Sequence, residues 1–207
     1  MTQVRPDIGS LLSGKIGEMV IAQLNGKFYV RSAPKRTKDS NTPNMLRNQK
    51  RFKEVISFCG QFKSTLIPQI WNDLDEKSVG YKLFMKANMP AFGKDGSITD
   101  VKMLRLSTGN LTIPDGFEAR RSETEANTIE VKWPKDLHLG GKHLKDELLV
   151  ISAAGGKFSE ITDTDILRGA LTGSFELPAK PTPATHIYLF FGSKDRRNYS
   201  QSVCFEV

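Results

Sequence analysis

The dipeptide Asn25-Gly26, placed between two apolar-rich segments, constrains the fold of this 207-residue chain more than any other feature. A type I′ turn needs positive φ at both central residues, and Asn-Gly adopts that conformation at little cost. The sequence therefore predicts a β-hairpin that begins at Gly14, turns at Asn25-Gly26 and ends at Ser32.

A basic amphipathic helix is predicted directly after the hairpin, from residue 43 to about residue 64. Thr42 is a good N-cap, and Pro43 suits the first helical position, where its missing N–H costs nothing. A second helix is expected over residues 78–89, followed by a linker and a domain boundary near residue 97. The first helix should bury one stripe of apolar residues at helical spacing, namely Phe52, Val55, Ile56, Cys59, Phe62 and Leu66.

The rest of the chain, residues 98–207, has the pattern of a β-sandwich, with short alternating segments separated by turn residues. The clearest segment runs from Thr128 to Trp133, which puts Trp133 on an inward face. The sequence thus predicts an α+β protein: a head of one β-hairpin plus two helices (residues 1–97), then an immunoglobulin or fibronectin III-like β-sandwich (residues 98–207). The expected strands are Lys102–Ser107, Phe117–Arg121, Thr128–Trp133, Glu147–Ala153, Lys157–Glu160, Gly169–Glu176, His186–Phe191 and Ser202–Val207.

Several short motifs resemble an uncharacterised family frequent in Bacteroidota. They are Gly14-Lys15-x-Gly17-x-x-Val20, Gly26-Lys27-x-x-Val30-Arg31-Ser32-x-Pro34, Thr42-Pro43 with Gln49-x-Arg51-Phe52, and Gly80-Tyr81-Lys82-Leu83-Phe84. The resemblance implies a hairpin–helix head followed by an immunoglobulin-like tail. Because the family is a domain of unknown function, the resemblance implies an architecture and no activity.

Positive charge is concentrated at the start of the chain. Residues 1–66 carry 12 Lys and Arg against 4 Asp and Glu, whereas the remaining residues carry 18 against 19. Seven of these cations are candidates for contact with an acidic partner or a phosphate backbone, namely Lys35, Arg36, Lys38, Arg47, Lys50, Arg51 and Lys53. The hairpin is the second candidate, with Phe28, Tyr29, Val30 and Arg31 as assembly contacts, because a two-stranded hairpin needs a partner and offers open edges.

Metal and thiol chemistry have weaker candidates. Asp136, His138 and His143 share one predicted loop, but a zinc site needs further ligands. The Asp163-Thr164-Asp165 segment, with Glu160 before it, is expected to be a turn and lacks the glycine and terminal glutamate of an EF-hand. Cys59 and Cys204 are expected to be free thiols. We therefore predict no metal and no cofactor.

The sequence favours a non-enzymatic structural or assembly protein, since it has no triad, nucleophile elbow or P-loop. The expected partner is another copy or another structural protein, in an oligomer such as a bacteriophage particle. A sequence-independent nucleic-acid-binding protein is the first alternative, and a glycan- or protein-binding surface module is the second. No signal peptide or membrane span is evident, so the expected location is cytoplasmic, with incorporation into a phage particle as an extension.

Overall fold

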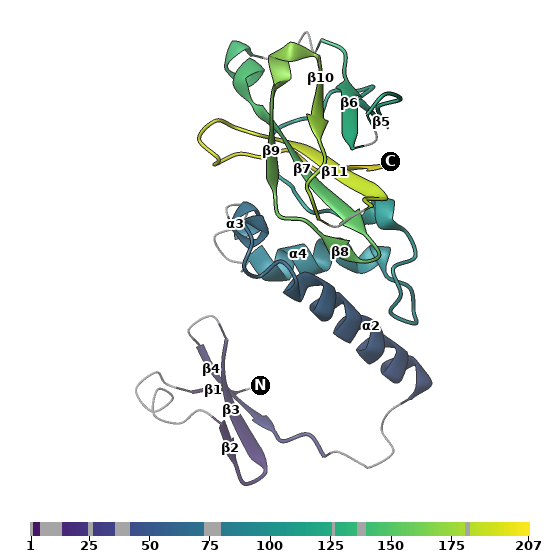
Figure 1. Cartoon of the computed structure of the whole chain (residues 1–207). Helices are drawn as coiled ribbons and strands as arrows, with labels where there is room; N and C mark the ends of the chain where they lie inside the picture. Colours follow the sequence, from purple (N-terminus) through teal and green to yellow (C-terminus); the bar gives the residue numbers. More distant parts are fainter. Residues whose placement is uncertain are drawn as a thin grey trace. The chain divides into compact units, whose positions relative to one another are not determined.

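A computed structural model describes residues 2–4, 14–24, 27–35, 42–72, 80–125, 127–135, 140–180 and 183–207 (Figure 1). The chain divides into two compact units, Met1–Pro43 (unit 1) and Asn44–Val207 (unit 2). The boundary expected near residue 97 differs from this division and falls inside unit 2. Each unit is described by itself.

Unit 1 is an antiparallel four-stranded sheet in the order β1-β4-β3-β2. Its strands β3 and β4 are the predicted hairpin, and they pair from Met19↔Ser32 to Leu24↔Lys27. The Asn25-Gly26 turn lies outside the described residues. The predicted hairpin is confirmed as the β3–β4 pair, but its first strand is shorter than expected, because Gly17, with φ of 57°, starts a second turn that separates residues 14–16 from residues 19–24. The strands are β1 (Thr2–Val4), β2 (Gly14–Ile16), β3 (Met19–Leu24) and β4 (Lys27–Ser32).

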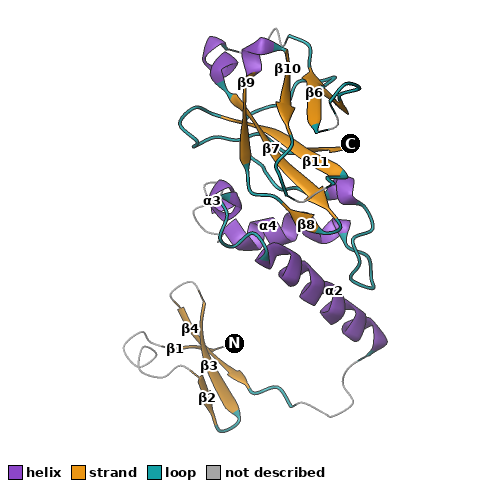
Figure 2. Cartoon of the chain, viewed as in Figure 1, coloured by secondary structure: helices purple, strands orange, loops and turns teal. Residues whose placement is uncertain are grey.

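The helices are α2 (Pro43–Gly60), α3 (Ile67–Asn72) and α4 (Gly80–Asn88), with short 3-10 turns η1 (Met89–Ala91) and η2 (Val101–Met103) (Figure 2). The predicted start of α2 is confirmed. Its predicted buried stripe is only half correct, since Val55, Cys59 and Phe62 are buried whereas Phe52, Ile56 and Leu66 are exposed. Phe52 is exposed because the buried residues of α2 all lie in its C-terminal part, where Phe58 meets aromatic rings of α4 and β8.

Unit 2 also holds two antiparallel sheets, a three-stranded one in the order β10-β6-β5 and a five-stranded one in the order β12-β11-β7-β8, with β9 also paired to β7. Most predicted strands are confirmed. The strand expected over residues 102–107 is wrong, because it begins inside η2 and continues as irregular backbone. The bounds are β5 (Glu118–Arg121), β6 (Thr128–Lys132), β7 (Glu147–Ala154), β8 (Lys157–Phe158), β9 (Thr162–Leu167), β10 (Thr172–Glu176), β11 (His186–Gly192) and β12 (Val203–Glu206), with η3 (Gly141–Lys145) and η4 (Arg168–Ala170).

The five-stranded sheet is covered on both faces. Along β7, Leu148 and Val150 join the core against the three-stranded sheet, while Leu149 and Ile151 join the core against the helices. Successive side chains of a strand point to opposite faces, so β7 and β11 are almost continuously buried. Helices and sheet therefore share one core, which explains why no unit boundary falls near residue 97.

The turn predicted at Asp163-Thr164-Asp165 is wrong, because these residues lie on β9. Thr164 is buried and donates through Oγ1 to the carbonyl of Leu148 at 2.8 Å, whereas Asp163 is exposed and pairs with Arg196. Asp is disfavoured in strands, and Asp165 has a positive φ of 59° where a bulge interrupts the pairing of β9 with β7, so the local sequence favoured a turn.

Candidate functional site

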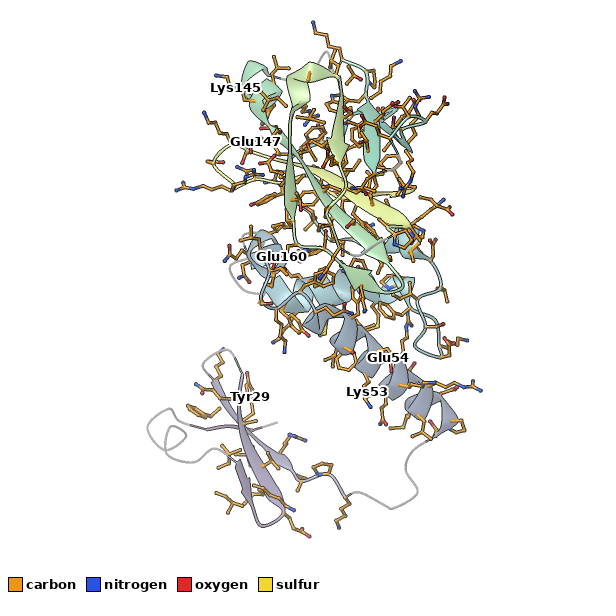
Figure 3. The ribbon with its side chains drawn as sticks, in the orientation of Figure 1. Tyr29, Lys53, Glu54, Lys145, Glu147 and Glu160 are labelled. Carbon is orange, nitrogen blue, oxygen red and sulfur yellow. The ribbon has the colours of Figure 1, made fainter. Side chains whose placement is uncertain are left out.

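The residues predicted for hairpin assembly divide between two faces of the unit 1 sheet. Because side chains alternate along β4, Phe28 and Val30 lie on one face, while Tyr29, labelled in Figure 3, and Arg31 lie on the other. The sequence grouped all four by proximity along the chain. The structure places only Phe28 and Val30 together.

The face of Phe28 and Val30 carries apolar side chains from three strands, and the register also puts the polar Gln23 and Ser32 on it. The register puts Ile21 opposite Val30, and Ile16 opposite Met19, on this same face. Phe28 is the only buried hydrophobic residue of unit 1 among those described, whereas Ile16 and Met19 are 48% and 54% exposed. We call Ile16, Met19, Ile21, Phe28 and Val30 the apolar sheet face.

The predicted basic cluster also divides. Lys35 belongs to unit 1, Arg36 and Lys38 lie outside the described residues, and Arg47, Lys50 and Lys53 are exposed on α2 (Lys53 in Figure 3). Among the described residues, no ion pair within 4 Å engages the three exposed α2 cations. Their charge is therefore available to a partner.

The charge of Lys50 interacts weakly with the carboxylate of Asp95. Asp95 has a lowered pKa chiefly because it accepts hydrogen bonds from Ser97, and the charge of Lys50 lowers that pKa further as a minor cause.

Arg51 faces a different surface from the other cations of α2. Its Nη2 donates to the carbonyl of Met89 at 2.7 Å, which ties α2 to the end of α4. Its Nε is buried and has no hydrogen-bond partner. Arg51 thus forms one side of a groove between the two helices.

That groove, the α2–α4 groove, encloses a cavity of about 520 Å³ lined by Arg51, Phe52, Lys82, Met85, Lys86, Met89 and Pro90. Lys86 and Pro90 also line a second cavity of about 700 Å³, to which Lys102 and Arg105 contribute. Sequence reasoning missed the α4 side. The spacing of Lys82 and Lys86 by one helical turn was the available signal, because it puts both charges on one face of α4.

The proposed zinc loop is only partly described, since Asp136 and His138 lie outside the described residues. His143 Nδ1 lies 3.1 Å from Asp146 Oδ2. Burial raises the pKa of Asp146, while the hydrogen bond from His143 and the charges of His143 and Arg168 oppose that rise. Within the described ranges, no three His, Cys, Asp or Glu side chains are grouped as a metal site.

Both cysteines are free, as predicted. Cys59 is fully buried on the inward side of α2, and burial raises its thiol pKa to about 12. Cys204 is half-buried on β12 and its pKa is also raised by burial. These are the properties of packed side chains and not of activated nucleophiles.

The architecture defines the class of this chain as α+β, with helices on one face of an antiparallel sheet. Comparisons with family models, with curated proteins and with solved structures find no match. The resemblance to a Bacteroidota family stays a prediction. No helix of the described residues is long and apolar enough to cross a membrane.

Proposed function

We propose that this chain is a non-enzymatic assembly protein that associates with further copies of itself through the apolar sheet face of unit 1. The observation that carries the proposal is the exposure of Ile16 and Met19 beside Ile21 and Val30 on one side of a small sheet. We also assign the two facing sheets of unit 2 to the immunoglobulin-like class, supported by their antiparallel pairing and by Trp133 buried between them.

Size makes the apolar sheet face unfavourable to leave in water. Unit 1 spans Met1–Pro43, and units of about 40 residues usually need a metal, disulfides or a partner to supply enough burial. Among the described strands of unit 1, β2 stands at one edge of the sheet, and an edge strand offers backbone groups for pairing. A second copy would cover the apolar face and could extend the edge by β-augmentation.

The test is the oligomeric state of the full chain. Met19→Lys puts a charge on the apolar sheet face, so mass photometry should show a shift towards monomer. Ala22→Lys is the matched control, since the register puts Ala22 on the opposite face beside Tyr29, and it should leave the oligomer intact. A wild-type chain that stays monomeric at high micromolar concentration would refute self-assembly.

Sequence-independent nucleic-acid binding is a second candidate, favoured by the exposed Arg47, Lys50 and Lys53, which form no ion pair within 4 Å to the part of the chain that the structure describes. It predicts an affinity that falls steeply with salt, with a slope reduced by about one unit when a contacting cation is removed. A gel shift that shows no complex at low salt would eliminate it.

The two further predictions, glycan binding and membership of a bacteriophage particle, are not favoured by any observation of this kind. A glycan platform usually exposes an aromatic ring, but Trp71 and Trp133 are both buried. Membership of a bacteriophage particle stays a prediction, and neighbouring portal, capsid or tail genes would support it.

A further inference from the structure

The surface around α4 combines an apolar floor with cations. In the α2–α4 groove, Met85, Met89 and the exposed ring of Phe52 form the floor, and Arg51, Lys82 and Lys86 contribute the charges. The second cavity continues past Lys86 and Pro90 and adds Lys102 and Arg105. The described lining residues of the two cavities include no Asp or Glu.

We propose that this continuous surface binds a peptide segment of another protein that is both acidic and apolar, most simply an amphipathic helix with carboxylates beside its apolar stripe. The argument is charge complementarity: the described lining holds five cations and no carboxylate, which attracts acidic side chains, while the floor accepts apolar ones. Helix-in-groove recognition uses this division, with apolar anchors spaced at i, i+3, i+4 and i+7. The proposal does not depend on self-assembly through unit 1.

The helices of a second copy of the chain are poor occupants of the groove. Across α2, α3 and α4 the only acidic residue is Glu54, so none of these helices offers an acidic face. Two copies meeting through α2 and α4 would instead oppose lysines with lysines, at a cost in desolvation and repulsion.

A phosphate backbone fits the floor less well than a peptide does. Nucleic-acid grooves pair cations with exposed aromatic rings on which bases stack. The α2–α4 groove is built mainly from Met85, Met89 and Pro90, with Phe52 as the one aromatic residue in its described lining, and Trp71, which lines the second cavity, is only 4% exposed. Methionine side chains adapt to irregular apolar partners and are frequent at peptide-binding surfaces. The chemistry of the floor thus favours leucine-like anchors over bases.

Fluorescence anisotropy of the full chain with a labelled synthetic peptide tests the proposal. The probe carries leucine at i, i+3, i+4 and i+7 and glutamate at most other positions. A scrambled peptide of the same composition and a lysine-for-glutamate peptide are its controls. We expect the probe to bind, the scrambled peptide to bind at least about tenfold more weakly and the lysine peptide not to bind, since anchors and charge must both match.

Lys86 is the informative residue because it lines both cavities. Lys86→Glu should weaken probe binding by about fivefold or more, the combined effect of one attraction lost and one repulsion gained. Lys145→Glu is the matched control, because it makes the same charge change on η3, at an exposed position outside both cavities (Lys145 in Figure 3). Its affinity for the probe should stay within about twofold of the wild-type value. Phe52→Ser should weaken binding while leaving its salt dependence unchanged, since it removes an anchor and no charge. Circular dichroism verifies that each variant is folded.

Three outcomes would overturn the proposal. One is no binding of the probe at low salt, and another is equal binding of the probe and its scrambled control. The third is a DNA duplex that binds more tightly than the probe and is equally sensitive to Lys86→Glu. Self-assembly through unit 1 is measured separately with Met19→Lys, so either proposal can fail alone.

Discussion

The unit 1 sheet and the five-stranded sheet of unit 2 are both antiparallel, yet they bury their side chains differently. In unit 1 only Phe28 among the described apolar residues is buried, and Ile16 and Met19 stay exposed. In unit 2 the strands β7 and β11 are buried on both faces, by helices on one side and by a second sheet on the other.

The difference distinguishes the five-stranded sheet of unit 2, which is a buried scaffold, from the unit 1 sheet, which exposes an apolar surface. A sheet covered on both sides has no face left for a partner, so we place the proposed contacts of unit 2 on α2 and α4. A sheet with one apolar face open is stabilised by whatever covers that face. Substitutions in unit 2 should therefore have the stronger effect on the free energy of unfolding, and substitutions in unit 1 should affect association.

Phe190→Ala should give the largest loss of stability. Phe190 is fully buried on the helix-facing side of β11, where its ring lies 6.3 Å from that of Tyr199. Truncation of a buried Phe costs about 3–5 kcal/mol in free energy of unfolding, because the cavity refills only partly. Chemical denaturation measures this loss of unfolding free energy.

Met19→Ala is the control, at an exposed position of the unit 1 sheet, and it should cost less than about 0.5 kcal/mol. Equal losses for the two variants would contradict the contrast between the sheets.

Asn88→Ala should give the next largest loss. Asn88 is fully buried at the end of α4, and its Nδ2 donates to the carbonyls of Phe84 and Arg105, each at 3.0 Å. Its Oδ1 accepts from the N–H of Arg105 at 2.8 Å. Removing the amide takes away three hydrogen bonds and leaves the part-buried N–H and carbonyl of Arg105 without this partner, which costs about 1–3 kcal/mol in total.

Thermal or urea unfolding checks this loss, and the exposed Asn110→Ala serves as the control. A cost for Asn88→Ala below about 1 kcal/mol would mean that water replaces the amide, and that α4 is less firmly attached to the sheet than its burial indicates.

Much of the fold follows from local sequence. Asn25-Gly26 located the β3–β4 pair, Pro43 located the start of α2, and alternation located β6 with Trp133 in its core. β9 could not be found this way, because only its long-range pairing with β7 makes a strand of an Asp-Thr-Asp segment.

The shared core and the α2–α4 groove depend on contacts between elements, which a pattern along the sequence does not contain. The unbroken apolar run from Leu148 to Ile151 was a signal that both faces of β7 are covered, but it does not say which element covers them. Helical spacing put Phe52 in the core because it cannot tell where along α2 the packing partner ends. Lys82 and Lys86 join Arg51 at one surface only through the packing of α4 on α2.

Alkaline pH should destabilise unit 2 through Cys59. Its pKa is raised from 9.0 to about 12 because the buried thiolate would lose its hydration. The unfolded chain therefore releases this proton first, and the stability that the neutral thiol contributes is present below pH 9 and lost as the pH rises towards 12. Cys59→Ala should flatten the decline in urea midpoint over this range, whereas an unchanged slope would show that another group governs it.

The smallest effect is expected on the outward face of the three-stranded sheet. Arg120 and Glu130 form an ion pair at 3.0 Å, with 77% and 41% of their side chains exposed. Exposed pairs contribute about 0.5 kcal/mol or less, because solvent screens the attraction and ordering both side chains costs entropy. Arg120→Ala should therefore shift the urea midpoint barely at low salt and not at all in concentrated salt. A larger, salt-independent loss would show that this outward face is also covered, and that burial on both faces is not confined to the five-stranded sheet.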